Sequence, residues 1–91
     1  MARRLEELTR ELVRTPAAVV VANHAVGLYE LAVLHLAQKP PNLAEARLAI
    51  DALAALVEGL AGRLGDNEPT LREFLTRVRL LFVEVSTGAS G

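Results

Sequence analysis

The chain has 91 residues, a formal net charge of −1 and a hydrophobic fraction of 52%, of which little is aromatic. This length allows one small core, and the near-neutral charge gives no general attraction to nucleic acid or anionic lipid. The absence of cysteine excludes disulfides, thiolate catalysis and cysteine-based zinc sites. A chain this short and this apolar has more hydrophobic surface than its interior covers, so we expect a homo-oligomer.

The first predicted element, over residues 2–14, is an amphipathic surface helix. Its apolar residues share one stripe and its charged residues take the opposite face. The stripe consists of Leu5, Leu8, Leu12 and Val13. The segment is acidic as well as basic and has no continuous apolar stretch, so it does not resemble a signal peptide, and we expect a cytoplasmic protein.

The second predicted element, over residues 16–39, is a helix that is apolar almost all the way round. Such a helix has to be buried in a core, in a partner or in a membrane. Thr15 is the predicted N-cap and Pro16 the first helical residue, because proline costs no hydrogen bond there. Pro40 ends the helix, because proline disfavours helical geometry in the residue before it.

A polar strip along this helix makes a membrane span unfavourable. The strip contains Asn23, Gly27, Glu30, Leu34 and Gln38, with His24 and His35 at its margin. One charged residue at the centre of a bilayer costs about 2.5–3.5 kcal/mol on insertion scales, so we expect no membrane partner. The opposite face is the predicted core and consists of Ala18, Val19, Val21, Ala22, Ala25, Val26, Ala32, Val33 and Leu36.

The third predicted element, over residues 43–64, carries an apolar seam at alternating spacings of three and four residues, a heptad pattern. The seam consists of Leu43, Ala46, Ile50, Leu53, Val57, Leu60 and Leu64. Asn42 is the predicted N-cap, with Glu45 completing a variant capping box. Since only a short turn separates the second and third elements, they should form an antiparallel hairpin.

The fourth predicted element, over residues 70–86, starts at a capping box formed by Thr70 and Glu73, or at Asn67 as an earlier cap. It contributes both phenylalanines and hence the bulky part of the core. No strand is predicted. The expected fold is therefore all-α, with one domain over residues 1–86, a flexible tail over 87–91 and a bundle completed by oligomerisation.

The candidate chemistry of this sequence is confined to His24, Glu30 and His35. The two histidines are roughly 16 Å apart along one helix and so cannot share a metal ion. They are either structural, hydrogen-bonded at the edge of the core, or part of a ligand site, which an antiparallel twofold pair would build from His24 of one chain and His35 of the other. No nucleophile arrangement, phosphate loop or constellation of two acids on one face is visible, since both serines, Ser86 and Ser90, lie in the predicted tail, so we expect no enzymatic activity, no catalytic residue, no cofactor and no metal.

Arg72, Arg77 and Arg79 suggest a third possibility, a nucleic-acid-binding accessory protein. Arg72 and Arg79 share a helical face, but neighbouring glutamates dilute the positive charge and no aromatic platform accompanies them. A solvated face of mixed charge is the preferred interpretation.

Three short patterns lie along the predicted helices: Val33–Leu36 at the end of one, Asn42-Leu43, Ala46-Arg47 and Ile50–Leu53 in the next, and Phe82–Glu84 in the last. Through these patterns, residues 17–86 resemble a bacterial family called Domain of Unknown Function 1844. The loop over residues 65–69 departs from the family pattern. Because the family has no assigned activity, the resemblance implies a helical fold and no mechanism, and it does not say whether His35, Asn42, Arg47 or Asp51 serves packing or binding.

Taken together, these patterns predict a non-enzymatic helical module that self-associates, as a dimer in preference to a tetramer, with another protein as a further candidate partner. The face expected to form the core or the oligomer interface consists of Ala18, Ala22, Ala25, Ala32, Leu36, Ile50, Leu53, Val57 and Leu60. A small-ligand or metal-binding protein and a nucleic-acid-binding protein are the alternatives.

Overall fold

The computed structural model describes residues 2–90 and contains no strand in that range. The all-α prediction with four α-helices is confirmed. These helices are α1 (Ala2–Arg14), α2 (Ala17–Leu36), α3 (Leu43–Gly59) and α4 (Glu68–Ser90), with a short 3-10 helix, η1 (Gly65–Asn67), before α4. Gly91, the last residue of the predicted tail, lies outside the described residues.

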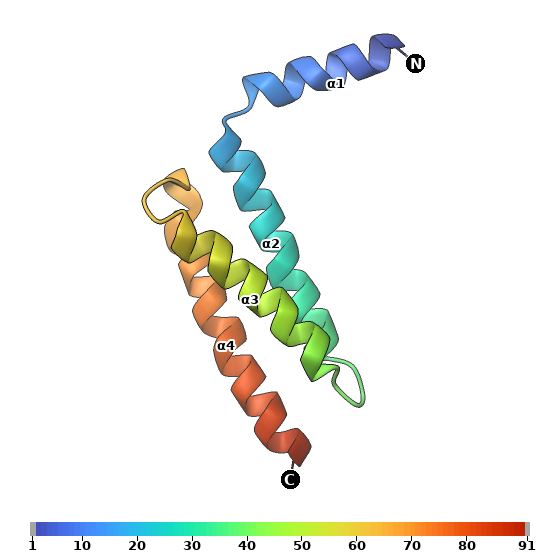
Figure 1. Ribbon diagram of the computed structural model, residues 1–91, viewed down its shortest axis with the longest axis vertical. Helices are drawn as coiled ribbons and strands as arrows, with labels where there is room; N and C mark the ends of the chain where they lie inside the picture. Colours follow the sequence, from blue (N-terminus) through green and yellow to red (C-terminus); the bar gives the residue numbers. More distant parts are fainter. Residues whose placement is uncertain (1, 91) are drawn as a thin grey trace.

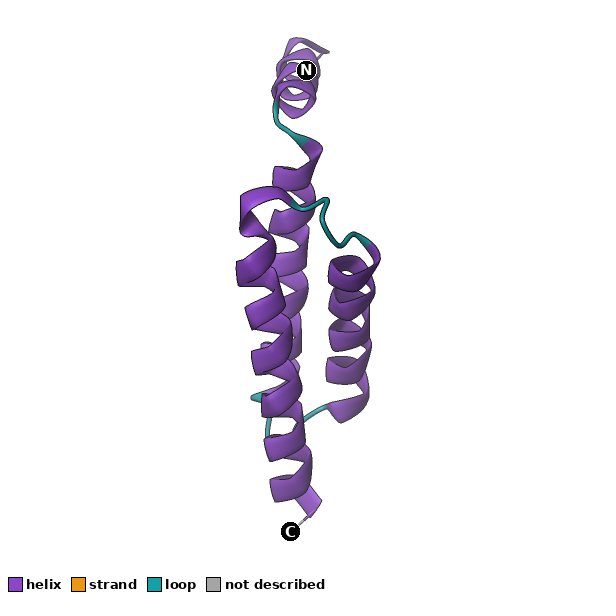
Figure 2. Cartoon of the chain, turned by 90° about the vertical axis from the view of Figure 1, so that its left-hand side faces the viewer, coloured by secondary structure: helices purple, strands orange, loops and turns teal. Residues whose placement is uncertain are grey.

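Helices α2, α3 and α4 pack together as a bundle (Figure 1). α2 and α3 form the predicted antiparallel hairpin, and α4 returns along both of them, antiparallel to α3 and parallel to α2. Seen from the side, α3 and α4 stand next to each other with α2 behind them (Figure 2). α2 therefore has one side facing the bundle and one side facing away from it.

The core lies where these helices meet, and α2 contributes mostly small side chains to it. Small residues allow α3 and α4 to approach the α2 backbone closely, while α3 and α4 supply the branched side chains. The buried residues are Ala22, Ala25, Ala32, Leu36, Ala46, Ala49, Ile50, Leu53, Ala54, Val57, Leu64, Leu71, Leu75 and Val78. Phe74 of α4 stacks on Tyr29 of α2, with ring centroids 4.5 Å apart.

Most of the predicted core and seam lies where the periodicity placed it. Ala18 and Leu60 are half-buried at its two margins. The prediction for Val19 is wrong. It was expected in the core, but it is exposed because it lies at the edge of the inner face of α2.

The start and end of α2 differ from the prediction. Its N-cap is Pro16, which makes no side-chain cap bond, and the Thr15 hydroxyl instead donates backwards to the carbonyl of Glu11 (2.9 Å). α2 ends at Leu36, three residues early. There the N–H of Asn42 donates to the His35 carbonyl (3.0 Å), which closes a turn that contains both prolines.

The other helix ends show why α3 is shorter and α4 longer than predicted. Asn42 caps α3 as expected, its side chain accepting from the N–H of Glu45 (3.2 Å). α3 ends at Gly59 instead of Leu64, and the chain leaves helical geometry through Gly62 at φ +81°. α4 begins at Glu68 and continues to Ser90, so the predicted Thr70 capping box is wrong and most of the predicted tail is helical.

α1 stands apart from the bundle, and within the described residues it packs against no other helix. It leaves the start of α2 at a wide angle, on the side away from α3 and α4 (Figure 1). All of its described residues are exposed, including the whole apolar stripe from Leu5 to Val13. The molecule is consequently elongated, with extents of 55 × 33 × 15 Å.

Candidate functional site

The most unusual surface of the molecule is the side of α2 that faces away from the bundle. We call it the outer face and define it by Val20, Asn23, Gly27, Glu30, Leu31 and Leu34. At about 100° per residue, these positions lie within about 60° of Gly27. Leu34 is 61% exposed and Leu31 43%, and no other helix of residues 2–90 lies against this side of α2 (Figure 1).

Gly27 lies at the centre of the outer face and has no packing role within its own chain. A Cβ added there would meet nothing within 4 Å. Glycine inside a helix costs about 1 kcal/mol relative to alanine, so an unneeded one weakens α2. The position suits the close approach of another backbone, which the single chain does not provide.

α2 is also the one helix in the described residues that is long and apolar enough to cross a membrane, judged by length and composition alone. It has 20 residues and a mean hydropathy of 1.6, and only 17% of its most apolar window is buried. However, α3 and α4 run alongside it and carry exposed ion pairs such as Arg47–Asp51 and Arg79–Glu58. Lipid around α2 would also surround these charges, which is unfavourable.

The structure does not gather His24, Glu30 and His35 into one site. His24 and Glu30 are exposed on opposite edges of the outer face, and His35 is half-buried beyond its margin. None of the three has an ion pair or side-chain hydrogen bond within the described chain. Among the same residues, no group of three histidine, aspartate or glutamate side chains is placed to hold a metal ion.

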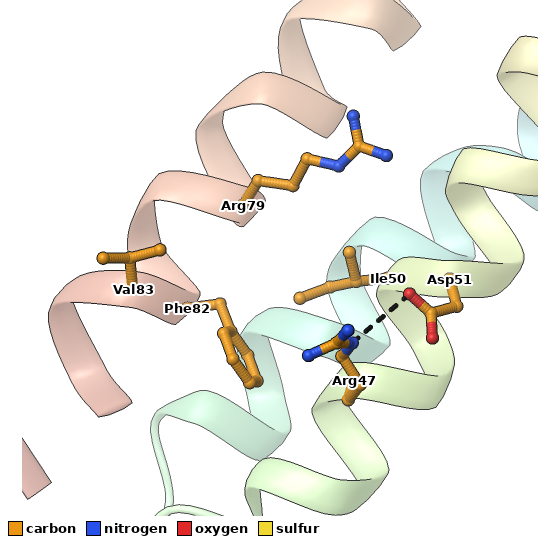
Figure 3. Close-up of a pocket in the computed structure, with 6 residues that line it drawn as sticks. All are labelled: Arg47, Ile50, Asp51, Arg79, Phe82 and Val83. Carbon is orange, nitrogen blue, oxygen red and sulfur yellow. Dashed lines mark ion pairs between the residues drawn. The ribbon is translucent and has the colours of Figure 1, made fainter. Parts of the chain in front are cut away.

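A shallow groove of about 280 Å³ lies between α3 and α4 (Figure 3). The Arg47 guanidinium lies 5.8 Å from the centre of the Phe82 ring and 3.5 Å from the Asp51 carboxylate, and Ile50 forms part of the lining. Arg79, on the other side, pairs with Glu58 (3.1 Å). Both cations already have carboxylate partners, so the groove joins α3 to α4 and offers no unpaired charge to a ligand.

The arginines proposed for nucleic-acid binding are neutralised in the same way. Arg72 pairs with Glu68 (3.1 Å) and Arg77 with Glu73 (2.9 Å), in addition to the Arg79–Glu58 pair. The outer side of α4 is therefore a surface of mixed charge.

Glu68 is a structural residue that the sequence did not reveal. Its carboxylate accepts from the N–H of Gly62 (2.9 and 3.0 Å) and of Leu64 (3.2 Å), which closes the loop between α3 and α4. These backbone donors, together with Arg72, lower the pKa of Glu68. A glutamate at a helix start suggests capping, but the loop donors that it binds lie up to six residues earlier and are visible only in the folded chain.

The chain was compared with family models, with curated proteins and with solved structures, and none of them matches it. The resemblance to the Domain of Unknown Function 1844 family stays a prediction. The residues themselves are thus the basis for any functional conclusion.

Proposed function

We propose that this protein is a non-enzymatic helical module that self-associates through the outer face of α2, as a homodimer. One observation supports this most strongly: α2, the most apolar of the described helices, leaves Leu34 61% and Leu31 43% exposed. Full burial of a leucine side chain contributes about 1.5–3 kcal/mol, so a second subunit on this face gains substantially from covering them.

The polar residues of the outer face fit a protein partner better than lipid. Asn23, His24 and Glu30 find hydrogen-bonding groups or water at a protein interface, whereas hydrocarbon offers neither. The exposed ion pairs of α3 and α4 favour contact with water over contact with lipid, and we propose a cytoplasmic protein. The paired arginines of α4 likewise favour a module that does not bind nucleic acid.

α1 is the natural surface for any assembly larger than a dimer. A helix of 13 residues is marginal in water without tertiary contacts, and its apolar stripe is entirely exposed. In our proposal the dimer forms on the outer face of α2. A tetramer, or a complex with a second protein, would use the apolar stripe of α1.

Size-exclusion chromatography with light scattering tests this proposal on the wild-type chain and on Leu34→Asp. We expect a dimer for the wild type at micromolar concentration and a folded monomer for the variant. Leu80→Asp is the matched control, because Leu80 is 59% exposed on the outer side of α4; it should remain a dimer. A monomeric wild type, or a dimeric Leu34→Asp, would contradict the proposal.

A further inference from the structure

The arrangement of residues on the outer face defines how the two subunits meet. We infer that a second copy of the chain binds antiparallel along α2, with the twofold axis beside Gly27 and with Leu34 of each subunit lying against Val20 of the other, next to the hollow between α1 and α2. This inference rests on the proposed function and adds the orientation, the register and the contribution of α1.

Two of the apolar residues of the outer face, Val20 and Leu34, are placed symmetrically about Gly27. Val20 precedes Gly27 by seven residues and Leu34 follows it by seven. Seven residues are close to two helical turns, so all three share one line along the helix. When the partner runs antiparallel and crosses at Gly27, Val20 meets the partner's Leu34 at both ends of the contact.

The polar residues of the same face also find complementary partners in this register. Asn23 and Glu30 are seven residues apart and lie on one edge of the face. An antiparallel twofold pair brings each edge against the same edge of the partner, so the Asn23 amide can donate to the carboxylate of the partner's Glu30. On the other edge, Leu31 lies against the ring of the partner's His24.

A parallel pair satisfies these residues less well. In a parallel pair, each edge of the outer face lies against the other edge of the partner's outer face. Glu30 then lies beside the partner's Leu31, and its carboxylate has no donor. An unpaired carboxylate at an interface is unfavourable, and a polar residue that finds its partner in only one register specifies that register.

The position of α1 adds a second observation. The junction of α1 and α2 encloses an open hollow of about 510 Å³, whose α2 wall consists of Ala17, Val20 and Val21. Figure 1 shows α1 leaving α2 on the side away from α3 and α4. Because Val20 belongs both to this wall and to the line that meets the partner's Leu34, the hollow lies beside each end of the contact.

Gly27 fits the same geometry, since the two helices are nearest to each other at the twofold axis. With no side chain at this point, the backbones can approach closely and bring the flanking residues into contact, as small residues do at other close helix crossings.

Cysteine crosslinking tests the orientation directly, because the chain has no native cysteine. Val20→Cys and Leu34→Cys are prepared as separate proteins and treated with a short bismaleimide, each alone and after mixing under conditions that allow subunit exchange. We expect crosslinked dimer from the mixture only, containing one subunit of each variant. In an antiparallel dimer of Leu34→Cys alone, the two thiols are separated by 14 residues of helix, roughly 21 Å, and should not react.

The remaining outcomes separate this inference from the proposed function. Crosslinking of each variant with itself would overturn the inference in favour of a parallel dimer on the same face. If light scattering shows a wild-type dimer but no sample gives a crosslink, the interface lies elsewhere. That result would overturn both the proposed outer-face interface and its antiparallel register. Leu80→Cys mixed with Val20→Cys is the control for random collision and should give no product.

Discussion

The two faces of α2 differ both in composition and in surroundings. On the inner face, alanines such as Ala25 and Ala32 are fully buried against α3 and α4. On the outer face, Leu34 is mostly exposed although it is larger and more hydrophobic than either alanine. Within one chain, then, α2 buries three alanines and Leu36 and leaves Leu31 and Leu34 exposed.

The inner face entered the core because all of its residues are apolar and many are small, whereas the outer face carries Asn23 and Glu30. α3 and α4 can approach an alanine face closely, and their own leucines, valines and aromatic rings then fill the interior. The outer face has one residue without a side chain, Gly27, between bulkier neighbours. That shape is suited to a single crossing helix and not to a flat bundle contact.

The strongest test of the difference is to place the same charge on each face. Ala32→Asp should unfold the bundle, because a buried carboxylate without a partner costs at least about 3 kcal/mol. Leu34→Asp, two residues further along the helix, should keep wild-type helicity and lose only the dimer. Circular dichroism during thermal melting compares the two variants, and a folded Ala32→Asp protein would refute the assignment of the inner face.

Gly27→Ala should have opposite effects on folding and on assembly. In a monomeric Leu34→Asp background it should stabilise the fold by about 1 kcal/mol, because alanine is the better helix former and the added Cβ meets open space. In the wild-type background it should weaken the dimer about tenfold, or 1.4 kcal/mol, by holding the helices apart. Urea titration measures the first effect and dilution of the dimer the second; a strengthened dimer would argue against close approach.

Glu68→Gln should destabilise the end of the bundle that is remote from the α2–α3 turn. The lowered pKa of Glu68 means that its ionised form stabilises the fold. This contribution is present at neutral pH and is lost as the pH falls through the pKa of the folded chain. The melting temperature of Glu68→Gln should therefore be below that of the wild type at neutral pH. The difference between the two melting temperatures should disappear at acidic pH.

Glu73→Gln is the matched control for this effect. Glu73 also pairs with an arginine four residues on, Arg77, but it accepts no loop N–H in the described structure. Removing the Glu73 carboxylate should change the melting temperature little at any pH. An equal effect from both glutamates would mean that the loop donors of Glu68 do not contribute.

The smallest effect is expected in α1. Leu8→Ala should change the unfolding free energy of the Leu34→Asp monomer by no more than about 0.5 kcal/mol, because Leu8 touches no other helix. Leu53→Ala, in the centre of the bundle, should cost about 2–5 kcal/mol in the same assay. A large loss from Leu8→Ala would show that α1 packs on its own bundle.

Periodicity and local capping explain what the sequence revealed of the fold. The seam of α3 repeats every three or four residues, so its buried side was predictable, and Asn42 bonds only to the neighbouring Glu45 N–H. The early end of α2 was not predictable, because it depends on Asn42 bonding back to His35 across the turn. Glu68 is similar, since its partners belong to a loop that forms only when α4 packs.

The candidate site was predictable in composition but not in exposure. The sequence placed Asn23, Gly27, Glu30 and Leu34 on one strip and small residues opposite. Whether that strip would be covered depended on where α4 and α1 lie, which no local pattern encodes. Ala22 and Ile50, which were expected in the core or an oligomer interface, are buried in the core of the single chain, and Leu31 and Leu34 are left exposed.

Sedimentation equilibrium of the wild-type chain beside Leu34→Asp tests the central claim most directly. Our account predicts twice the 9.8 kDa chain mass for the wild type at micromolar concentration and the single-chain mass for the variant. A wild type that sediments as a monomer throughout that range, or a variant that sediments as a dimer, would contradict the assignment of the outer face of α2 as a self-association surface.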